Sequence, residues 1–197
     1  MNEAFFAEHG RRQRVFCASL ADVFDNEVPG LWRQHLMSLV AKTPNLDWLF
    51  LTKRIGNARK MLTEACMHDG LLLTADDQYR PPANLWIGAT ITSQAEADRD
   101  IPKLLATPAA KRFLSMEPLL GPVDLTHLPI LGRDRMIGLP KDVHINALKG
   151  FYDMNAGGQS KIDWVIVGGE SGPGARPMHP DWARSLRDQC QTAGVSF

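Results

Sequence analysis

Five short apolar runs, rich in β-branched and aromatic residues, constrain the fold of this chain more than any other feature. In each run the apolar residues are nearly continuous rather than alternating with polar ones. That pattern is typical of parallel strands buried on both faces of a sheet. The runs are RVFCASL (14–20), DWLFLTKR (47–54), LWIGATI (85–91), KRFLSME (111–117) and DWVIVGGE (163–170).

Helical patterns lie between these runs. A helix over 31–42 is predicted from residues at helical spacing, and TPN (43–45) ends it. Ser93 and Glu96 fit a capping box at the start of a helix over 93–106. The last helix begins near Pro180 and ends at Gly194. The pattern of the first helix consists of Leu31, Trp32, His35, Leu36, Leu39 and Val40.

Strands that alternate with helices in this way predict right-handed βαβ units and an α/β fold with a parallel sheet. An open doubly wound sheet and all or part of a (β/α) barrel both satisfy the pattern. No GxGxxG follows the first run, which disfavours a dinucleotide-binding fold and favours a partial, TIM-barrel-like (β/α) barrel. We expect a single domain over 1–197 with excursions at about 63–84 and 124–162, and FYDMNAGGQS (151–160) as an exposed loop.

Charge and cysteine content narrow the function classes. Lys+Arg and Asp+Glu are both 22, so net charge does not indicate nucleic-acid or membrane binding. Cys17, Cys66 and Cys190 form no CxxC pair and are predicted to be buried apolar residues. No metal site is predicted. The chain has no signal-peptide pattern and no run of 18 apolar residues, so a soluble, cytoplasmic protein is expected.

Polar residues collect where the runs end. Because the carboxyl ends of parallel strands share one rim of the sheet, ligands bind there in α/β proteins. Strand ends are also polar simply because the chain emerges into solvent, so each residue alone has two explanations. As a set they predict a ligand site formed by Ser19, Asp22, Thr52, Lys53, Thr90, Glu117, Gly168, Gly169, Glu170 and Ser171.

Individual members suit different roles. Lys53 and Arg54 are consecutive, so only one is expected to face the rim, either toward a ligand or in a salt bridge to Asp22 or Glu117. Glu117 could act as a general base or accept hydrogen bonds from an amine or a ribose hydroxyl. Gly168 and Gly169 would permit close approach of the backbone and present Glu170. The stretch GGESGPG is neither a Walker loop nor a nucleophile elbow.

Five strings carry a resemblance along most of the chain: RVFCASLADVFDNEVP, NLDWLFLTKR, LWIGATI, RFLSMEPLLGPVDL and IDWVIVGGESGPGARPMHPDWARSLRDQC. They resemble the phage protein family known as gp thirty-seven / gp sixty-eight, found in phages and prophages and without an assigned function. That family is similar in outline to radical S-adenosylmethionine proteins. The resemblance implies that Gly168, Gly169 and Glu170 face a nucleoside-type cofactor, in a cavity also lined by Ser19, Thr52, Lys53, Thr90 and Glu117.

The sequence departs from this pattern in lacking the N-terminal cysteine segment that ligates an iron–sulfur cluster in full-length relatives. We therefore expect a barrel fragment truncated at both ends. In this form it would hold no cluster and would not cleave S-adenosylmethionine reductively. Unpaired edges and uncovered apolar faces predict self-association.

Two further functions stay open. One is a non-enzymatic phage binding module for a nucleotide, a small metabolite or a protein partner. The other is a hydrolase or lyase that uses Glu117 and Glu170 as acid and base without a cluster.

Overall fold

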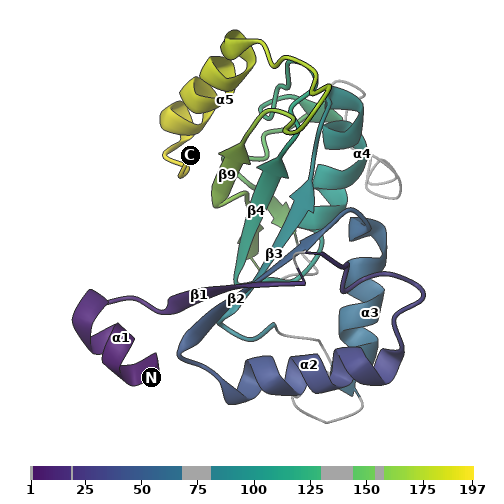
Figure 1. Cartoon of the computed structure of the whole chain (residues 1–197), viewed down its shortest axis with the longest axis vertical. Helices are drawn as coiled ribbons and strands as arrows, with labels where there is room; N and C mark the ends of the chain where they lie inside the picture. Colours follow the sequence, from purple (N-terminus) through teal and green to yellow (C-terminus); the bar gives the residue numbers. More distant parts are fainter. Residues whose placement is uncertain (1, 19, 68–80, 130–143, 154–157) are drawn as a thin grey trace. The chain divides into compact units, whose positions relative to one another are not determined.

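The predicted sheet is present in the computed structural model, which describes residues 2–18, 20–67, 81–129, 144–153 and 158–197 (Figure 1). Parallel pairing joins β1 to β2, with Val15 opposite Trp48, and β4 to β9, with Ser115 opposite Ile166. The prediction of an α/β fold with a parallel, partial (β/α)-barrel sheet is confirmed. The strands, in sheet order, are β1 (Gln13–Cys17), β2 (Leu46–Thr52), β3 (Leu85–Thr90), β4 (Lys111–Met116) and β9 (Trp164–Val167).

The chain divides into two compact units. Unit 1 comprises Met1–Gly88 and Thr107–Lys111, and unit 2 comprises Ala89–Ala106 and Arg112–Phe197. The first boundary falls inside β3 rather than in a linker, so no change in composition marks it in the sequence.

Among the described residues of unit 1, the helices are α1 (Asn2–His9), α2 (Gly30–Lys42) and α3 (Ile55–Met67). In Figure 1, α2 and α3 lie against each other. The helix predicted over 31–42 is confirmed, and Thr43 follows it as the C-cap. The excursion expected at 63–84 is wrong at its start, because α3 continues to Met67 on a buried face that includes Leu62 and Cys66. Residues 68–80 lie outside the described residues.

The buried face of α2 is narrower than its sequence pattern predicts. Met37 and Val40 are buried, whereas the side chains of Leu31, Trp32 and Leu39 are 56%, 65% and 46% exposed. The apolar residues of this helix cover more of its circumference than the core of unit 1 contacts. The sequence pattern therefore predicts the helix, while burial is confined to part of its apolar residues.

Unit 2 contains α4 (Gln94–Leu105) and α5 (Pro180–Ala193). The serine half of the predicted capping box is confirmed, since the Ser93 hydroxyl accepts a hydrogen bond from the Glu96 amide. The Glu96 carboxylate reaches one residue further back than in a capping box and accepts from the Thr92 amide at 2.7 Å. Pro180 begins α5, and Gly194 ends it in the left-handed conformation with φ +66°. Both predicted ends of the last helix are therefore confirmed.

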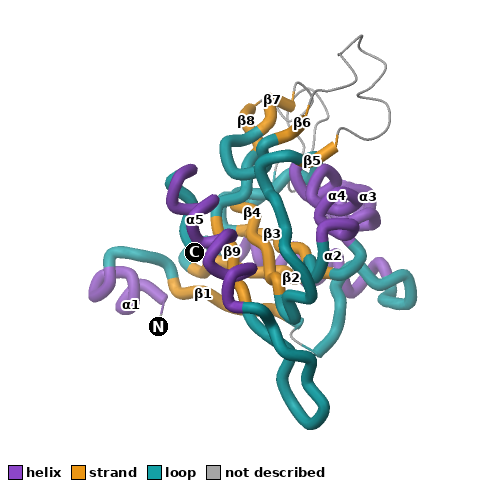
Figure 2. The backbone as a smooth tube through the Cα atoms, turned by 90° about the horizontal axis from the view of Figure 1, so that it is seen from above, coloured by secondary structure: helices purple, strands orange, loops and turns teal. Residues whose placement is uncertain are grey.

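Short strands occupy part of the excursion expected at 124–162. β5 (Leu128–Pro129) pairs antiparallel with β6 (His144–Ile145), and β7 (Phe151–Asp153) with β8 (Gly158–Ser160) (Figure 2). The exposed loop expected at 151–160 is therefore wrong, since two strands form there. Leu128, Ile145, Ala147 and Leu148 are buried and contribute to the core. Residues 130–143 and 154–157 lie outside the described residues.

Candidate functional site

Three polar side chains share one face of the sheet in unit 2. The Ile91 amide donates a hydrogen bond to the Ser115 carbonyl, and the Gly168 amide donates one to the Met116 carbonyl. In parallel pairing these bonds align Thr90 with Ser115 and Glu117 with Gly168. Because side chains alternate along a strand, Thr90, Ser115 and Glu117 lie on the same face, opposite to Leu114 and Met116. We call these three residues the β4 rim.

Glu117 presents a carboxylate with no ion-pair or hydrogen-bond partner among the described residues, and it is exposed. Its side chain passes directly over Gly168. A Cβ atom on Gly168 would lie 2.8 Å from Cδ and 2.9 Å from Cγ of Glu117, closer than van der Waals contact allows. The glycine therefore leaves the space that the glutamate occupies.

Ser115 supplies a second polar group without a partner. The residue is 7% exposed, and its hydroxyl forms no hydrogen bond with any described residue. A buried hydroxyl left without a hydrogen bond costs about 1–3 kcal/mol. A ligand group or a water molecule at the β4 rim would remove this cost.

Glu170 is engaged within its own loop. The Arg176 side chain donates to it through Nε at 2.7 Å and through one terminal nitrogen at 2.8 Å, and the Arg176 amide donates at 2.8 Å. These hydrogen bonds lower the pKa of Glu170 to about 2. Gly172 and Gly174, with φ +97° and +78°, turn the chain so that Arg176 returns to Glu170. Gly169 and Ser171 are exposed beside this pair.

The other predicted site residues belong to unit 1, where the Asp22 carboxylate connects two segments of the chain. Its carboxylate accepts hydrogen bonds from the Thr52 hydroxyl at 2.8 Å, the Phe24 amide at 3.0 Å and the Lys53 amide at 3.1 Å. Thr52 is 2% exposed. These bonds fasten the segment after β1 to the carboxyl end of β2.

Arg54, rather than Lys53, forms the ion pairs at this position. Its guanidinium contacts Asp25 at 2.8 Å and Asp22 at 3.4 Å. The Lys53 side chain is exposed and has no partner among the described residues. The salt bridge to Asp22 that was one alternative for Lys53 is therefore formed by Arg54, and which of the two cations faces the rim stays a prediction. Ser19 lies outside the described residues.

Two arginines that form ion pairs with predicted site residues were not among the predicted residues themselves. One is Arg54, which follows the same strand as the predicted Lys53. Arg176 lies six residues after Glu170, and the glycines between them are the signal that could have suggested a closed loop. A single rim shared by all ten predicted residues remains a prediction, because they belong to both units.

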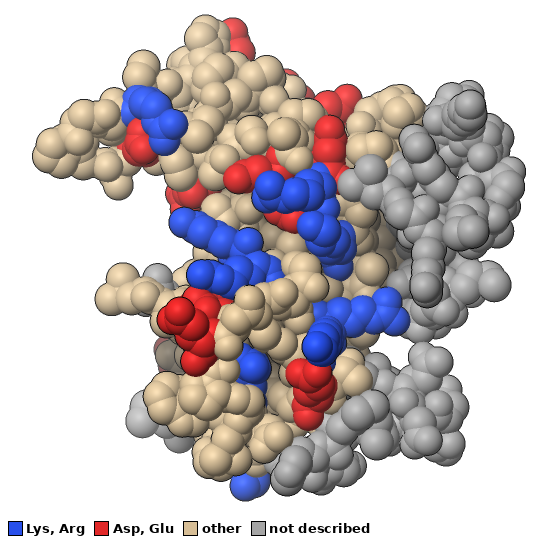
Figure 3. Space-filling view, turned by 90° about the vertical axis from the view of Figure 1, so that its right-hand side faces the viewer, with Lys and Arg blue, Asp and Glu red and all other residues tan. Residues whose placement is uncertain are grey.

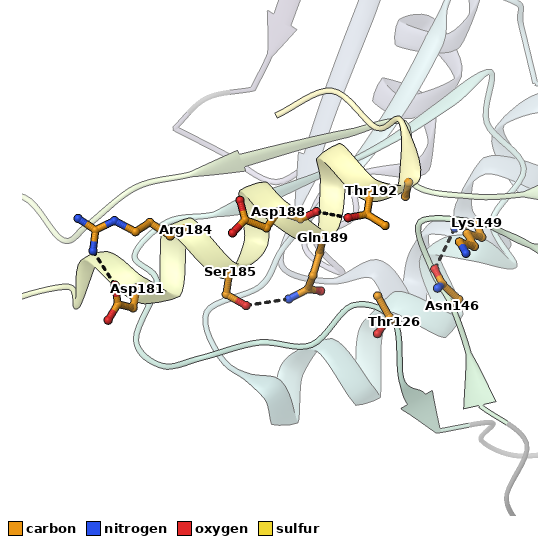
Figure 4. Close-up of a pocket in the computed structure, with 10 residues that line it drawn as sticks. Thr126, Asn146, Lys149, Asp181, Arg184, Ser185, Asp188, Gln189 and Thr192 are labelled. Atoms are coloured by element: carbon orange, nitrogen blue, oxygen red, sulfur yellow. Dashed lines mark hydrogen bonds and ion pairs between the residues drawn. The ribbon is translucent and has the colours of Figure 1, made fainter.

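A separate groove of about 630 Å³ lies along α5 (Figure 4). Both acidic residues that line it form ion pairs with arginines: Asp181 contacts Arg184 at 2.6 Å, and Asp188 contacts Arg187 at 2.6 Å. No predicted site residue lines it. The lining residues are Thr126, Asn146, Lys149, Asp181, Arg184, Ser185, Asp188, Gln189, Thr192 and Ala193.

The three cysteines do not fit an iron–sulfur cluster. Cys17 lies on β1, Cys66 is buried on α3 and Cys190 is buried on α5. Burial raises the pKa of the Cys190 thiol to about 11 and also raises the pKa of Cys17. Cluster ligands are thiolates, whereas burial disfavours the thiolate form of Cys17 and Cys190. Burial of Cys66 and Cys190 confirms their prediction as apolar core residues, whereas Cys17 is only half-buried.

Charges of both signs intermix on the surface drawn in Figure 3. In unit 2, the buried Asp100 of α4 contacts Arg99 at 2.6 Å and Lys103 at 2.9 Å. Within the described ranges, no helix combines the length and apolar composition needed to cross a membrane.

Comparison with known proteins gives one family. No curated protein and no solved structure gives a significant match to the chain. A family model described as "Protein of unknown function (DUF5131)" matches residues 4–197, which is nearly the whole chain. The chain therefore belongs to this family of proteins of unknown function.

Proposed function

We propose that the chain binds a small nucleoside-type molecule at the β4 rim in unit 2. The observation that carries the proposal is the occurrence of two polar groups, close together at the end of β4, that have no partner among the described residues. The exposed Glu117 carboxylate lies in the space above Gly168, and the Ser115 hydroxyl two residues earlier is buried. Their place at the carboxyl ends of parallel strands supports a binding site, because α/β proteins bind ligands there.

The chemistry of the β4 rim favours a ligand that donates hydrogen bonds. A carboxylate accepts from an ammonium group or from ribose hydroxyls, and the hydroxyls of Thr90 and Ser115 can either donate or accept. These groups fit the amino-acid and ribose parts of S-adenosylmethionine, which the resemblance to radical S-adenosylmethionine proteins makes the first candidate. S-adenosylmethionine contains an activated sulfonium centre, and this chain's own residues would bind and orient the molecule.

In this proposal the chain is the barrel part of a radical-S-adenosylmethionine-type protein of phage or prophage origin. Its cysteines do not fit a cluster, so the function proposed for this chain is binding. A non-enzymatic phage binding module would use the same rim, and absence of product after prolonged incubation with the ligand would favour it.

Acid–base catalysis by Glu117 and Glu170 receives less support. A general acid must carry a proton near the working pH. The pKa of Glu170 is lowered to about 2 by Arg176, so this carboxyl is ionised and hydrogen-bonded at neutral pH.

Titration calorimetry with S-adenosylmethionine, S-adenosylhomocysteine and adenosine tests the proposal. Wild type should bind at least one of them, and Glu117→Gln should weaken binding about tenfold or more. Glu27→Gln is the matched control, since Glu27 is an exposed carboxylate in unit 1. Absence of binding by wild type, or equal affinity of wild type and Glu117→Gln, would overturn the proposal.

A further inference from the structure

Two histidines that are 17 residues apart in sequence meet in unit 2. Leu128 of β5 is opposite Ile145 of β6, and both are buried. Side chains alternate along a strand, so His127 and His144 lie on the other, exposed face. Their ring centroids are 4.8 Å apart with the planes inclined at 42°.

This separation matches two imidazoles bound to one ion. A metal–nitrogen bond of about 2.0–2.1 Å places a ring centroid about 3.2 Å from the ion. Two rings bound at about 90–110° then have centroids about 4.5–5.2 Å apart. Aromatic pairs that only pack together have similar centroid distances. A metal site additionally requires ring nitrogens that are free to bind an ion.

The ring nitrogens are available. No described residue forms a hydrogen bond or an ion pair with the ring of His127 or His144. Both residues are exposed, so an ion in solvent can reach their rings. Imidazole nitrogen is the most common protein ligand for transition metals.

Asp124 adds negative charge beside His127. The Thr126 hydroxyl is 2.6 Å and its amide 2.8 Å from Oδ1 of Asp124. These two hydrogen bonds hold the carboxylate three residues before His127, where its negative charge favours a nearby cation.

We infer that His127 and His144 form a two-imidazole site for a divalent transition-metal ion, which joins β5 to β6. Within the described residues no group of three or more metal-ligating side chains occurs, so water molecules complete the coordination. The affinity should follow the order Cu²⁺ above Ni²⁺ above Co²⁺. Mg²⁺ and Ca²⁺, which prefer oxygen ligands, should not compete. The inference is independent of the proposed ligand at the β4 rim.

Titration calorimetry of the full chain with Ni²⁺ tests it. Wild type should bind one ion, and His127→Ala and His144→Ala should each weaken binding at least tenfold. His35→Ala is the matched control, because His35 is an exposed histidine on α2 in unit 1. It should bind Ni²⁺ as wild type does.

Electron paramagnetic resonance with Cu²⁺ gives a second measurement. The spectrum should show two nitrogen ligands in wild type and one in each single variant. His127→Gln and His144→Gln keep polar side chains at the two positions if the alanine variants fold poorly. Binding that is unchanged in both pairs of variants, or absent from wild type, would overturn the inference.

Discussion

The Glu117 side chain lies over the Cα atom of Gly168, in the space that any larger side chain at position 168 would need. A methyl group there would approach Cγ of Glu117 to 2.9 Å. Glu117 is exposed, so its side chain can move away. Gly168→Ala is therefore expected to change the free energy of unfolding by less than about 1 kcal/mol while displacing the carboxylate. Denaturant unfolding checks the stability, and carboxyl carbon shifts of Glu117 by NMR check the displacement.

Gly169 provides the control for that substitution. A Cβ atom there would contact Met178 Cβ at 3.6 Å, an ordinary packing distance. Gly169→Ala should leave the Glu117 resonance unchanged. Equal shifts in the two variants would contradict the described position of Glu117.

The ion pair of Glu170 with Arg176 predicts a specific titration. The hydrogen bonds from Arg176 lower the pKa of Glu170 to about 2, so the folded state stabilises the ionised carboxylate. This contribution is present above the pKa of the unfolded chain, near 4.5, and is lost as the pH falls through about 2. An NMR titration of the Glu170 carboxyl carbon should have its midpoint near 2 in wild type and move toward the ordinary range in Arg176→Ala. A midpoint near 4.5 in wild type would show that the pair does not form.

Asn84 is expected to contribute strongly to the stability of unit 1. It is 3% exposed, and its side-chain amide donates to the carbonyls of Val40 and Thr43 at 3.0 Å each. These carbonyls belong to the carboxyl end of α2, where intrahelical donors are missing. Asn84→Ala should lower the free energy of unfolding by about 1–3 kcal/mol, measured by denaturant titration.

Asn45→Ala is the comparison for this change, because Asn45 is half-buried and its side chain forms no hydrogen bond with a described residue. A cost below about 0.5 kcal/mol is expected for it. Similar losses in the two variants would show that the Asn84 hydrogen bonds do not stabilise α2.

Truncation of Arg54 and truncation of Lys53 to alanine should change the free energy of unfolding by different amounts. Arg54→Ala removes the ion pairs to Asp22 and Asp25 and should cost about 1 kcal/mol or less, since the guanidinium is partly exposed. Lys53→Ala removes a side chain without a described partner and should have almost no effect on stability. Thermal unfolding at low salt compares the two, and a larger loss in Lys53→Ala would contradict the assignment.

The predicted self-association can be measured directly. Leu31, Trp32 and Leu39 on α2 are each more than 40% exposed, and such apolar side chains favour association. Analytical ultracentrifugation should show a concentration-dependent mass that falls in the triple variant Leu31→Ser, Trp32→Gln, Leu39→Ser. A wild-type protein that stays monomeric at all concentrations would contradict the expectation.

The fold was predictable from the sequence to the extent that local patterns determine it. Continuous apolar runs identified all five strands of the main sheet, and Ser93, Pro180 and Gly194 located helix ends because capping depends on adjacent residues. The short strands between 128 and 160 could not be predicted, since β5–β6 and β7–β8 are two or three residues long and form only through pairing.

The positions of candidate residues relative to the strands were predictable, but their contacts were not. Glu117 and Gly168 directly follow β4 and β9, as the sequence pattern predicted, whereas their membership of a ligand site stays a prediction. Sequence could not show that Glu170 turns toward Arg176, because that depends on positive φ angles at Gly172 and Gly174. Nor could it show that His127 and His144 meet, because their approach depends on the register of two short strands.

Calorimetry of wild type, Gly168→Ala and Gly169→Ala with S-adenosylmethionine, S-adenosylhomocysteine and adenosine tests the central claim most directly. Each variant adds one methyl group and changes the chemical identity of no polar side chain of the β4 rim. The account predicts that wild type and Gly169→Ala bind at least one of these compounds with equal affinity, and that Gly168→Ala binds it about tenfold or more weakly. Equal affinity of all three proteins, or no binding by wild type, would contradict a ligand site organised by Glu117.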